Sequence, residues 1–171
     1  MPGSPVSLKT LTTSPSHREG TGREIIHQMK GKVDAFVAGV GTGGTLLGVA
    51  LALKQVYPAV RIIAVEPAES AVLSGGKPGC HRIAGIGEGF IPQLVQENRD
   101  LITGVIAVQS SDAIAMSKEL ARKHGVLVGV SSGANMVAAR MIAEESDRNV
   151  VTVLPDRGER YLSMQSRKRG D

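Results

Sequence analysis

The sequence predicts an α/β fold: a mostly parallel, twisted sheet of about five strands between two layers of helices, a three-layer αβα arrangement. Short runs rich in valine and isoleucine recur along the chain, as is typical of strands buried on both faces. Segments with a helical spacing of apolar residues separate most of these runs. Aromatic residues make up only 2% of the chain, so the core must be aliphatic. Such folds bind ligands at the carboxyl ends of their strands.

The elements are expected in the following order. Residues 1–16 are rich in Pro, Ser, Thr and Gly without periodicity, and we predict a disordered leader there. A first helix is predicted over 22–30, where Ile25, Ile26 and Met29 share one side. The Val- and Ile-rich runs predict strands at 33–38, 60–65, 105–108, 126–128 and 150–154. Apolar residues with helical spacing predict the intervening helices over 46–53, 113–120 and 134–142.

Length and composition indicate one domain. The chain has 171 residues, of which 42% are hydrophobic and 21% charged, values typical of a globular protein with one core. We assign residues 17–163 to this domain and residues 164–171 to a basic tail that contains Arg167, Lys168 and Arg169. The tail accounts for part of the net charge of +4, and we expect it to be solvated.

Composition also excludes several classes of function. Because aromatic side chains are so few, we expect no stacking platform and no nucleic acid partner. The chain has no continuous apolar run of roughly 18 residues and no signal-peptide core at its start, so we expect no membrane partner. The single cysteine, Cys80, has no internal disulfide partner and suits a reducing compartment. We therefore expect a cytoplasmic protein.

A turn rich in glycine and threonine follows the first predicted strand and leads directly into a helix. It is the end of the segment Val33-Asp-Ala-Phe-Val-Ala-Gly-Val-Gly-Thr-Gly-Gly-Thr45. Glycines let the backbone approach an anion, the helix N-terminus adds a favourable dipole, and threonine hydroxyls add donors. The turn therefore predicts a phosphate-binding site made of Gly41, Thr42, Gly43, Gly44 and Thr45.

Several interpretations of this turn compete. A nucleoside triphosphatase P-loop needs a lysine after its second glycine, and here Thr45 follows Gly44 directly. A dinucleotide-binding turn is matched by Gly39, Gly41 and Gly44, and Glu66 ends the next strand where a ribose-binding acid would stand. A third possibility is a small phosphorylated cofactor such as pyridoxal phosphate. A glycine turn that serves only close packing is the remaining alternative.

A long glycine-rich loop over 74–104 separates the second and third predicted strands, and long loops in compact domains are usually functional. Cys80 and His81 lie in this loop. We predict no metal site there, because neighbours in sequence rarely converge on one ion and no second cysteine or nearby histidine completes a ligand set.

Four further stretches, together with this turn, resemble the cysteine synthase family. They are Val65-Glu-Pro67, Gly85-Ile-Gly-Glu-Gly-Phe-Ile-Pro92, Gly129-Val-Ser-Ser-Gly-Ala134 and Pro155-Asp-Arg-Gly-Glu-Arg-Tyr-Leu-Ser163. The members are O-acetylserine sulfhydrylases, fold-type II pyridoxal-phosphate β-synthases with cystathionine β-synthase as a near relative. The similarity covers residues 17–163 and implies the large-domain portion and carboxyl-terminal half of such an enzyme.

The resemblance implies roles for individual residues. The turn from Gly41 to Thr45 would hold the phosphate of pyridoxal 5′-phosphate, and Ser131 would contact its pyridine nitrogen. A neutral hydroxyl partner leaves that nitrogen largely unprotonated, which suits β-elimination and replacement. The substrate cleft beside the cofactor would be lined by Gly85, Ile86 and Gly87.

Three polar residues near these motifs can be explained by purely structural roles. Ser132 is predicted to cap a helix that starts at Gly133. The resemblance places the segment with Asp156 and Glu159 near the cofactor ring, but these side chains would equally serve as capping or salt-bridge residues.

Two motifs of the family are missing from this sequence. The Schiff-base lysine of the family lies in an Asn-Pro…Ser…Lys-Asp-Arg segment, and the substrate carboxylate binds a Thr-Ser-Gly-Asn-Thr loop; neither is present. The resemblance therefore implies cysteine formation from O-acetylserine or O-phosphoserine and sulfide by an enzyme of which this chain is a fragment without a catalytic residue. Its partners would be an amino-acid substrate and either a second copy or a complementing amino-terminal half, which would cover an open sheet edge. A non-catalytic remnant and an NAD-binding oxidoreductase are the alternatives.

Overall fold

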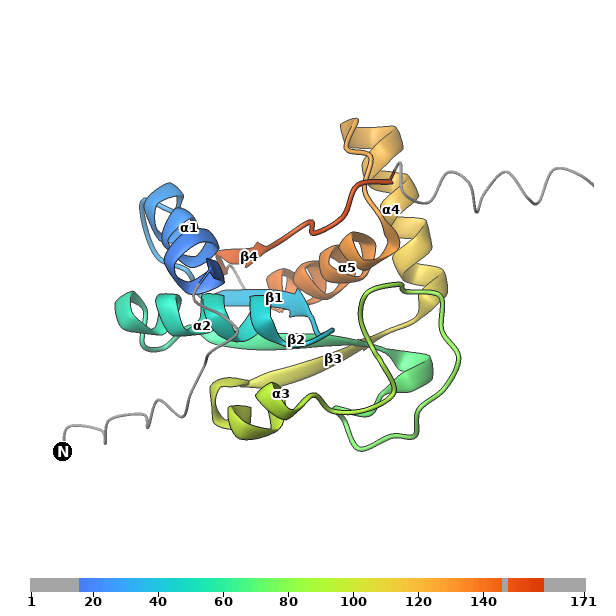
Figure 1. Ribbon diagram of the computed structural model, residues 1–171. Coiled ribbons are helices and arrows are strands. Elements are labelled where there is room, and N and C mark those ends of the chain that lie inside the picture. Colours follow the sequence, from blue (N-terminus) through green and yellow to red (C-terminus); the bar gives the residue numbers. More distant parts are fainter. Residues whose placement is uncertain (1–15, 146–147, 159–171) are drawn as a thin grey trace, which may run out of the picture.

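The computed structural model describes residues 16–145 and 148–158. Its strands are β1 (Ala35–Gly39), β2 (Arg61–Pro67), β3 (Gly104–Val108) and β4 (Val150–Thr152). They form one parallel sheet in the order β3-β2-β1-β4 (Figure 1). Ala35 of β1 lies opposite Arg61 of β2 and Val150 of β4. The predicted leader up to residue 15, Glu159 and the predicted basic tail lie outside the described residues.

Helices connect the strands. They are the π-helix η1 (His17–Gly22), α1 (Arg23–Gln28), α2 (Gly44–Val56), the short 3-10 helix η2 (Ala68–Ser70), α3 (Gln93–Glu97), the 3-10 helix η3 (Arg99–Leu101), α4 (Ser110–His124) and α5 (Val130–Glu144). None of the helices in the described residues is long and apolar enough to cross a bilayer.

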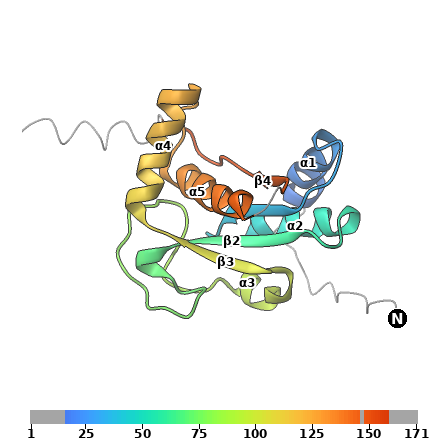
Figure 2. The same cartoon turned by 180° about the vertical axis from the view of Figure 1, so that it is seen from behind.

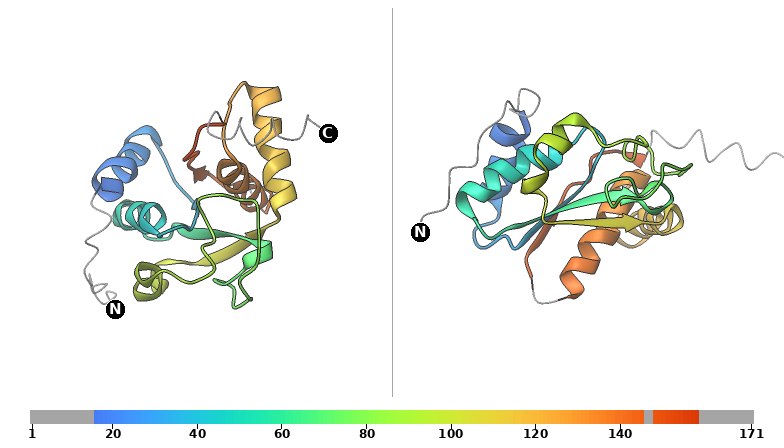
Figure 3. Two further views of the ribbon diagram at one scale, coloured as in Figure 1. Left: turned by 45° about the vertical axis from the view of Figure 1, so that its right-hand side comes forward. Right: turned by 90° about the horizontal axis from the view of Figure 1, so that it is seen from below.

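The sheet separates two aliphatic clusters, because successive side chains of a strand point to opposite faces. Phe36 and Ala38 of β1 are buried with residues of α2, and Ala35 and Val37 are buried with residues of α5. Helices α1, α2 and α3 lie on one face and α4 and α5 on the other, as the opposite views of Figures 1 and 2 and the left view of Figure 3 show. The predicted three-layer αβα fold is confirmed.

The fifth strand predicted at 126–128 is wrong. Helix α4 ends at His124, because its C-cap Gly125 has a left-handed φ of 68°, and α5 begins only a few residues later at Val130. Within this short connection Val128 forms a single antiparallel bridge with Arg157, and Leu127 is 47% exposed. The valines of this run are therefore not a buried strand, and the sheet of the described residues has four strands.

A glycine brings α4 and α5 into close contact on the second face of the sheet. A Cβ atom on Gly133 of α5 would lie 2.0 Å from the carbonyl oxygen of Ala113 in α4. The backbones of the two helices therefore approach each other where no other residue fits. This contact fixes the N-terminal turn of α5, which points to the carboxyl ends of the strands (Figure 1).

Candidate cofactor-binding site

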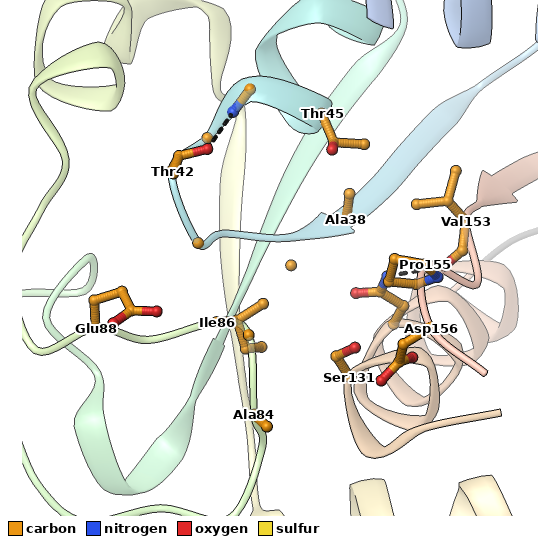
Figure 4. A pocket seen from close by; sticks show the side chains of 16 residues that line it. Ala38, Thr42, Thr45, Ala84, Ile86, Glu88, Ser131, Val153, Pro155 and Asp156 are labelled. Carbon is orange, nitrogen blue, oxygen red and sulfur yellow. Dashed lines mark hydrogen bonds between the residues drawn. The ribbon is translucent and has the colours of Figure 1, made fainter. Parts of the chain in front are cut away.

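A cavity of about 370 Å³ opens at the carboxyl end of β1, between the N-termini of α2 and α5 (Figure 4). It brings together most of the site residues that the sequence predicts. The lining residues are Ala38, Gly39, Gly41, Thr42, Gly43, Gly44, Thr45, Ala84, Gly85, Ile86, Glu88, Ser131, Asn135, Val153, Pro155 and Asp156.

The glycine turn between β1 and α2 forms one end of the cavity. Gly43 is the N-cap of α2 and has a φ of 86°, a left-handed conformation that favours glycine. A Cβ atom on Gly41 would lie 2.6 Å from the carbonyl oxygen of Gly85, so the turn and the long loop touch backbone to backbone. The amide of Gly44 donates to Thr42 Oγ1 over 3.4 Å. The partial positive charge of the α2 N-terminus faces the same space and favours an anion.

The hydroxyl of Thr45 is connected to the π-helix that precedes α1. Thr45 Oγ1 lies 3.2 Å from His17 Nε2, and His17 Nδ1 lies 3.2 Å from Thr21 Oγ1. The imidazole thus joins two threonine hydroxyls, one of which lines the cavity. This contact could not be predicted from the sequence, because His17 and Thr45 are 28 residues apart.

The opposite end of the cavity is formed by the first turn of α5. Ser131 is 5% exposed and lines the cavity. Ser132 is not the N-cap that the sequence suggests: α5 begins at Val130, its N-cap is Gly129, and Ser132 Oγ donates to Asp156 Oδ1. This hydrogen bond ties α5 to the segment after β4 and holds the Asp156 carboxylate beside the cavity.

The long loop forms the third wall. Gly85 and Ile86 line the cavity, but Gly87 is not among the lining residues. The amide of Gly87 donates to the carbonyl oxygen of Val40 over 3.0 Å, and its carbonyl oxygen accepts from His81 Nε2 at 2.8 Å. Its φ is 72°, and a Cβ atom would lie 2.5 Å from the Pro67 ring. Gly87 therefore fastens the loop to the ends of β1 and β2.

Two further polar residues, Glu88 and Asn135, line the cavity without having been predicted. Glu88 lies between two glycines of the loop, and the close-up shows its carboxylate directed toward Ile86 (Figure 4). Asn135 follows Ser131 by four residues on α5, and this helical spacing was the only signal in the sequence that could have found it.

Glu66 does not face the cavity, in contrast to the dinucleotide interpretation. Its side chain is 1% exposed, and its carboxylate accepts hydrogen bonds from the Leu73 amide at 2.7 Å and from the Ser74 amide at 3.0 Å. The Ser74 hydroxyl also donates to it. The carboxylate thus holds the start of the long loop. Its oxygens already accept these hydrogen bonds, so they are not available to bind the hydroxyls of a ribose.

The chain resembles known enzymes over most of its length. The profile of the family described as "Pyridoxal-phosphate dependent enzyme" matches residues 14–156. The cysteine synthase of Staphylococcus aureus is 49% identical over 150 residues, which are 86% of this chain and 48% of that protein. Cysteine synthase B of Campylobacter jejuni is 46% identical over 157 residues, or 91% of this chain and 52% of that protein.

Solved structures show the same similarity. The crystal structure of O-acetylserine sulfhydrylase isoform 3 from Entamoeba histolytica matches with a TM-score of 0.81 and 39% identity, over 88% of this chain and 45% of that one. The chain spans about half the length of the curated relatives it matches. The family profile covers far more than half of the chain, and the chain therefore belongs to the pyridoxal-phosphate dependent enzymes.

Proposed function

We propose that this chain supplies the phosphate site, the ring-nitrogen contact and one wall of the substrate cleft of a cysteine synthase. The intact enzyme would replace the leaving group of an activated serine, O-acetylserine or O-phosphoserine, by sulfide. The observation that carries the proposal is the single cavity lined by the glycine turn, by Ser131 and by the loop residues Gly85 and Ile86.

The residues of the cavity fit pyridoxal 5′-phosphate. Backbone amides at a helix N-terminus suit a phosphate monoester, and Cβ atoms at Gly41 or Gly43 would collide with neighbouring atoms at 2.6 and 2.5 Å. The volume of about 370 Å³ is in the range of small-ligand sites. When bound, the cofactor supplies an electron sink for bond cleavage at the substrate carbons.

Each residue has a defined task in this proposal. Thr42 and Thr45 would donate hydroxyls to the phosphate, with His17 holding the Thr45 hydroxyl in place. Ser131 would bind the ring nitrogen and so orient the ring. Gly85 and Ile86 would leave room for a small amino acid and exclude water from it.

No lysine lines the cavity among residues 16–145 and 148–158. The lysine that carries the cofactor would come from a complementing amino-terminal half or a longer form of the chain. We expect the isolated chain to bind the cofactor without turnover, because the nucleophile and general base are both missing. We propose residues 17–163 as one cofactor-binding domain, a cytoplasmic location, and assembly with such a half or as a homodimer.

Calorimetric titration of the chain tests the site. We expect pyridoxal phosphate, pyridoxine phosphate and inorganic phosphate to compete for it, and NAD to bind more weakly than pyridoxal phosphate. Tighter binding of NAD would favour the dinucleotide alternative, in which Gly39, Gly41 and Gly44 hold a pyrophosphate.

Reconstitution tests the activity. The chain is co-expressed with the amino-terminal half of the Staphylococcus aureus cysteine synthase, which contributes the part that this chain does not match. Cysteine formation from O-acetylserine and sulfide is expected only when both halves are present. Cofactor binding without cysteine formation would favour the non-catalytic remnant.

A further inference from the structure

The loop wall of the cavity is bridged by one side chain, that of His81. Nε2 of its imidazole lies 2.8 Å from the carbonyl oxygen of Gly87, and Nδ1 lies 3.3 Å from the backbone nitrogen of Ile83. These contacts are made with both ends of a segment whose middle residues line the cavity. His81 itself is half-buried and is not among the lining residues.

The partners of the two ring nitrogens fix where the imidazole carries its proton. A carbonyl oxygen only accepts, so Nε2 must donate to Gly87, and a backbone amide only donates, so Nδ1 must accept from Ile83. The imidazole is therefore neutral, with its one proton on Nε2. A charged imidazole has a proton on both nitrogens, and its Nδ1–H would face the Ile83 N–H, a donor against a donor.

The segment that His81 bridges touches the phosphate-binding turn directly. A Cβ atom on Gly41 would lie 2.6 Å from the carbonyl oxygen of Gly85, and the Gly87 amide donates to the Val40 carbonyl over 3.0 Å. Glycine loses more conformational freedom on folding than other residues, so a segment with glycines at 85 and 87 depends on such contacts to stay ordered. A shift of the segment would change the shape of the cavity beside the glycine turn.

We propose that His81 is a positioning residue of the cavity: its neutral imidazole holds the loop wall in place, and protonation of the imidazole loosens the wall and weakens ligand binding. The inference rests on the proposed function, since the ligand is taken to be a pyridine phosphate ester. Histidine is the side chain that ordinarily changes its charge between pH 5 and 8. The cavity should therefore hold its ligand more weakly at the acidic end of this range.

Charged groups surround His81. Burial opposes the charge of Glu69 in η2, but hydrogen bonds from Ser110 of α4 hold its pKa below the ordinary value of 4.5, so this carboxylate stays charged and attracts a positive imidazole. The adjacent Arg82, whose amide donates to the Ser110 hydroxyl over 2.9 Å, opposes a second positive charge. Glu88, next in the chain to the glycine that His81 contacts, adds a negative charge.

The experiment measures the affinity of the full chain for pyridoxine 5′-phosphate by calorimetry at about pH 8 and about pH 5.5. In His81→Asn the amide oxygen takes the place of Nδ1 as acceptor for the amide two residues ahead, and it does not titrate. We expect the affinity of the unmodified chain to fall about fivefold more at the lower pH than that of His81→Asn, as the loss of one hydrogen bond predicts.

His27→Asn, at an exposed position on α1, is the matched control and should behave like the unmodified chain. The ionisation of the ligand phosphate and of His17, the histidine beside Thr45, is common to all three proteins, so it cancels in the comparison. A larger fall in the unmodified chain and in His27→Asn than in His81→Asn supports the inference.

The outcomes separate this inference from the proposed function. An equal fall in the unmodified chain and in His81→Asn would overturn the role of His81 and leave the cofactor site intact. Failure of the unmodified chain to bind the ligand at either pH would overturn the proposed function, and the free chain then tests His81, as it does if His81→Asn does not fold.

In the free chain, the 15N chemical shifts of the His81 imidazole should place the proton on Nε2 at about pH 8. The protection of the Gly87 amide against hydrogen exchange should fall at about pH 5.5, while that of the β1 amides should stay constant. A proton on Nδ1, or a Gly87 protection that does not change with pH, would overturn the inference.

Discussion

At the scale of single residues, Thr45 links the candidate phosphate site to the rest of the protein. It stands in the first turn of α2, lines the cavity, and shares its hydroxyl with His17. When His17 Nε2 carries the proton and donates to Thr45 Oγ1, the threonine proton is left to donate into the cavity. A phosphate in the cavity needs such donors, so its binding should favour the tautomer of His17 with the proton on Nε2.

Thr45→Val tests this contact, because valine keeps the branched shape and removes the hydroxyl. We expect the affinity for inorganic phosphate to fall about tenfold, as a lost hydrogen bond to a charged group predicts. Thr21→Val is the matched control: Thr21 contacts the other nitrogen of His17 and does not line the cavity. Equal affinities of both variants, measured by calorimetry, would contradict a direct role of Thr45.

Residues that line the cavity could be predicted where consecutive residues form a turn whose geometry depends on the sequence of that turn alone. The turn at positions 41–45 could be predicted because glycines directly before a helix let the backbone approach an anion, and Gly43 does adopt the left-handed conformation expected of such a turn. Glu88 and Asn135 were missed because their position depends on the path of a loop and on the rotation of a helix. Gly87 was assigned to the cleft from its motif, and the fold uses it to fasten the loop to Val40.

At the scale of elements, the contact between α4 and α5 determines where the N-terminus of α5 lies. Gly133→Ala should destabilise the protein by about 2–3 kcal/mol, because the new Cβ would lie 2.0 Å from the Ala113 carbonyl oxygen and backbone does not move aside. Urea unfolding measures the change. Gly20→Ala is the control, since a Cβ there meets no atom within 4 Å. If Gly133→Ala left the free energy of unfolding unchanged, the backbones of α4 and α5 would not be in close contact at this position.

The start of α4 is held by an acid from another element. Glu69 in η2 accepts the Ser110 backbone amide over 2.9 Å. Burial opposes ionisation of Glu69, but hydrogen bonds from the amide and hydroxyl of Ser110 outweigh it and hold the pKa of Glu69 below its ordinary value of 4.5. A carboxyl with a lowered pKa in the folded state stabilises the fold above its ordinary pKa and loses that contribution as the pH falls through the lowered value.

The unfolding free energy should therefore decrease below about pH 4.5 more steeply for the unmodified protein than for Glu69→Gln, which has no charge to lose. Urea unfolding at a series of pH values measures both curves, and their difference isolates Glu69 from the other carboxyl groups. Parallel curves would show that the Ser110 contact contributes nothing to stability.

Helices and strands could be predicted where the pattern of apolar residues is compatible with only one type of secondary structure. The runs that became β1 and β2 are buried on both faces, and helix and strand alternate around them. The run at 126–128 has the same composition, but Gly125 and Gly129 leave it too little chain to cross back into the sheet. Composition alone cannot distinguish a buried strand from a short connection between two helices.

At the scale of the whole molecule, β3 is an edge strand of the sheet that the described residues form. The middle of this strand is half-buried and Ala107 is exposed. Unpaired edges of this kind invite pairing with another chain. Ala107→Lys should therefore reduce concentration-dependent association in sedimentation experiments without a change in unfolding free energy. Ala115→Lys, which adds the same charge at an exposed site on α4, is the control, and an equal effect of both would assign the change to net charge.

One wall of the cavity comes from a segment late in the described part of the chain. Val153, Pro155 and Asp156 follow β4, which is the last strand among the described residues and pairs with β1, the first. A chain that ends before this segment has the glycine turn and Ser131 but no enclosed space for a guest molecule. In a series of chains shortened from the carboxyl-terminal side, protection by the vitamin B6 phosphate ester against proteases should therefore arise abruptly once Asp156 is included.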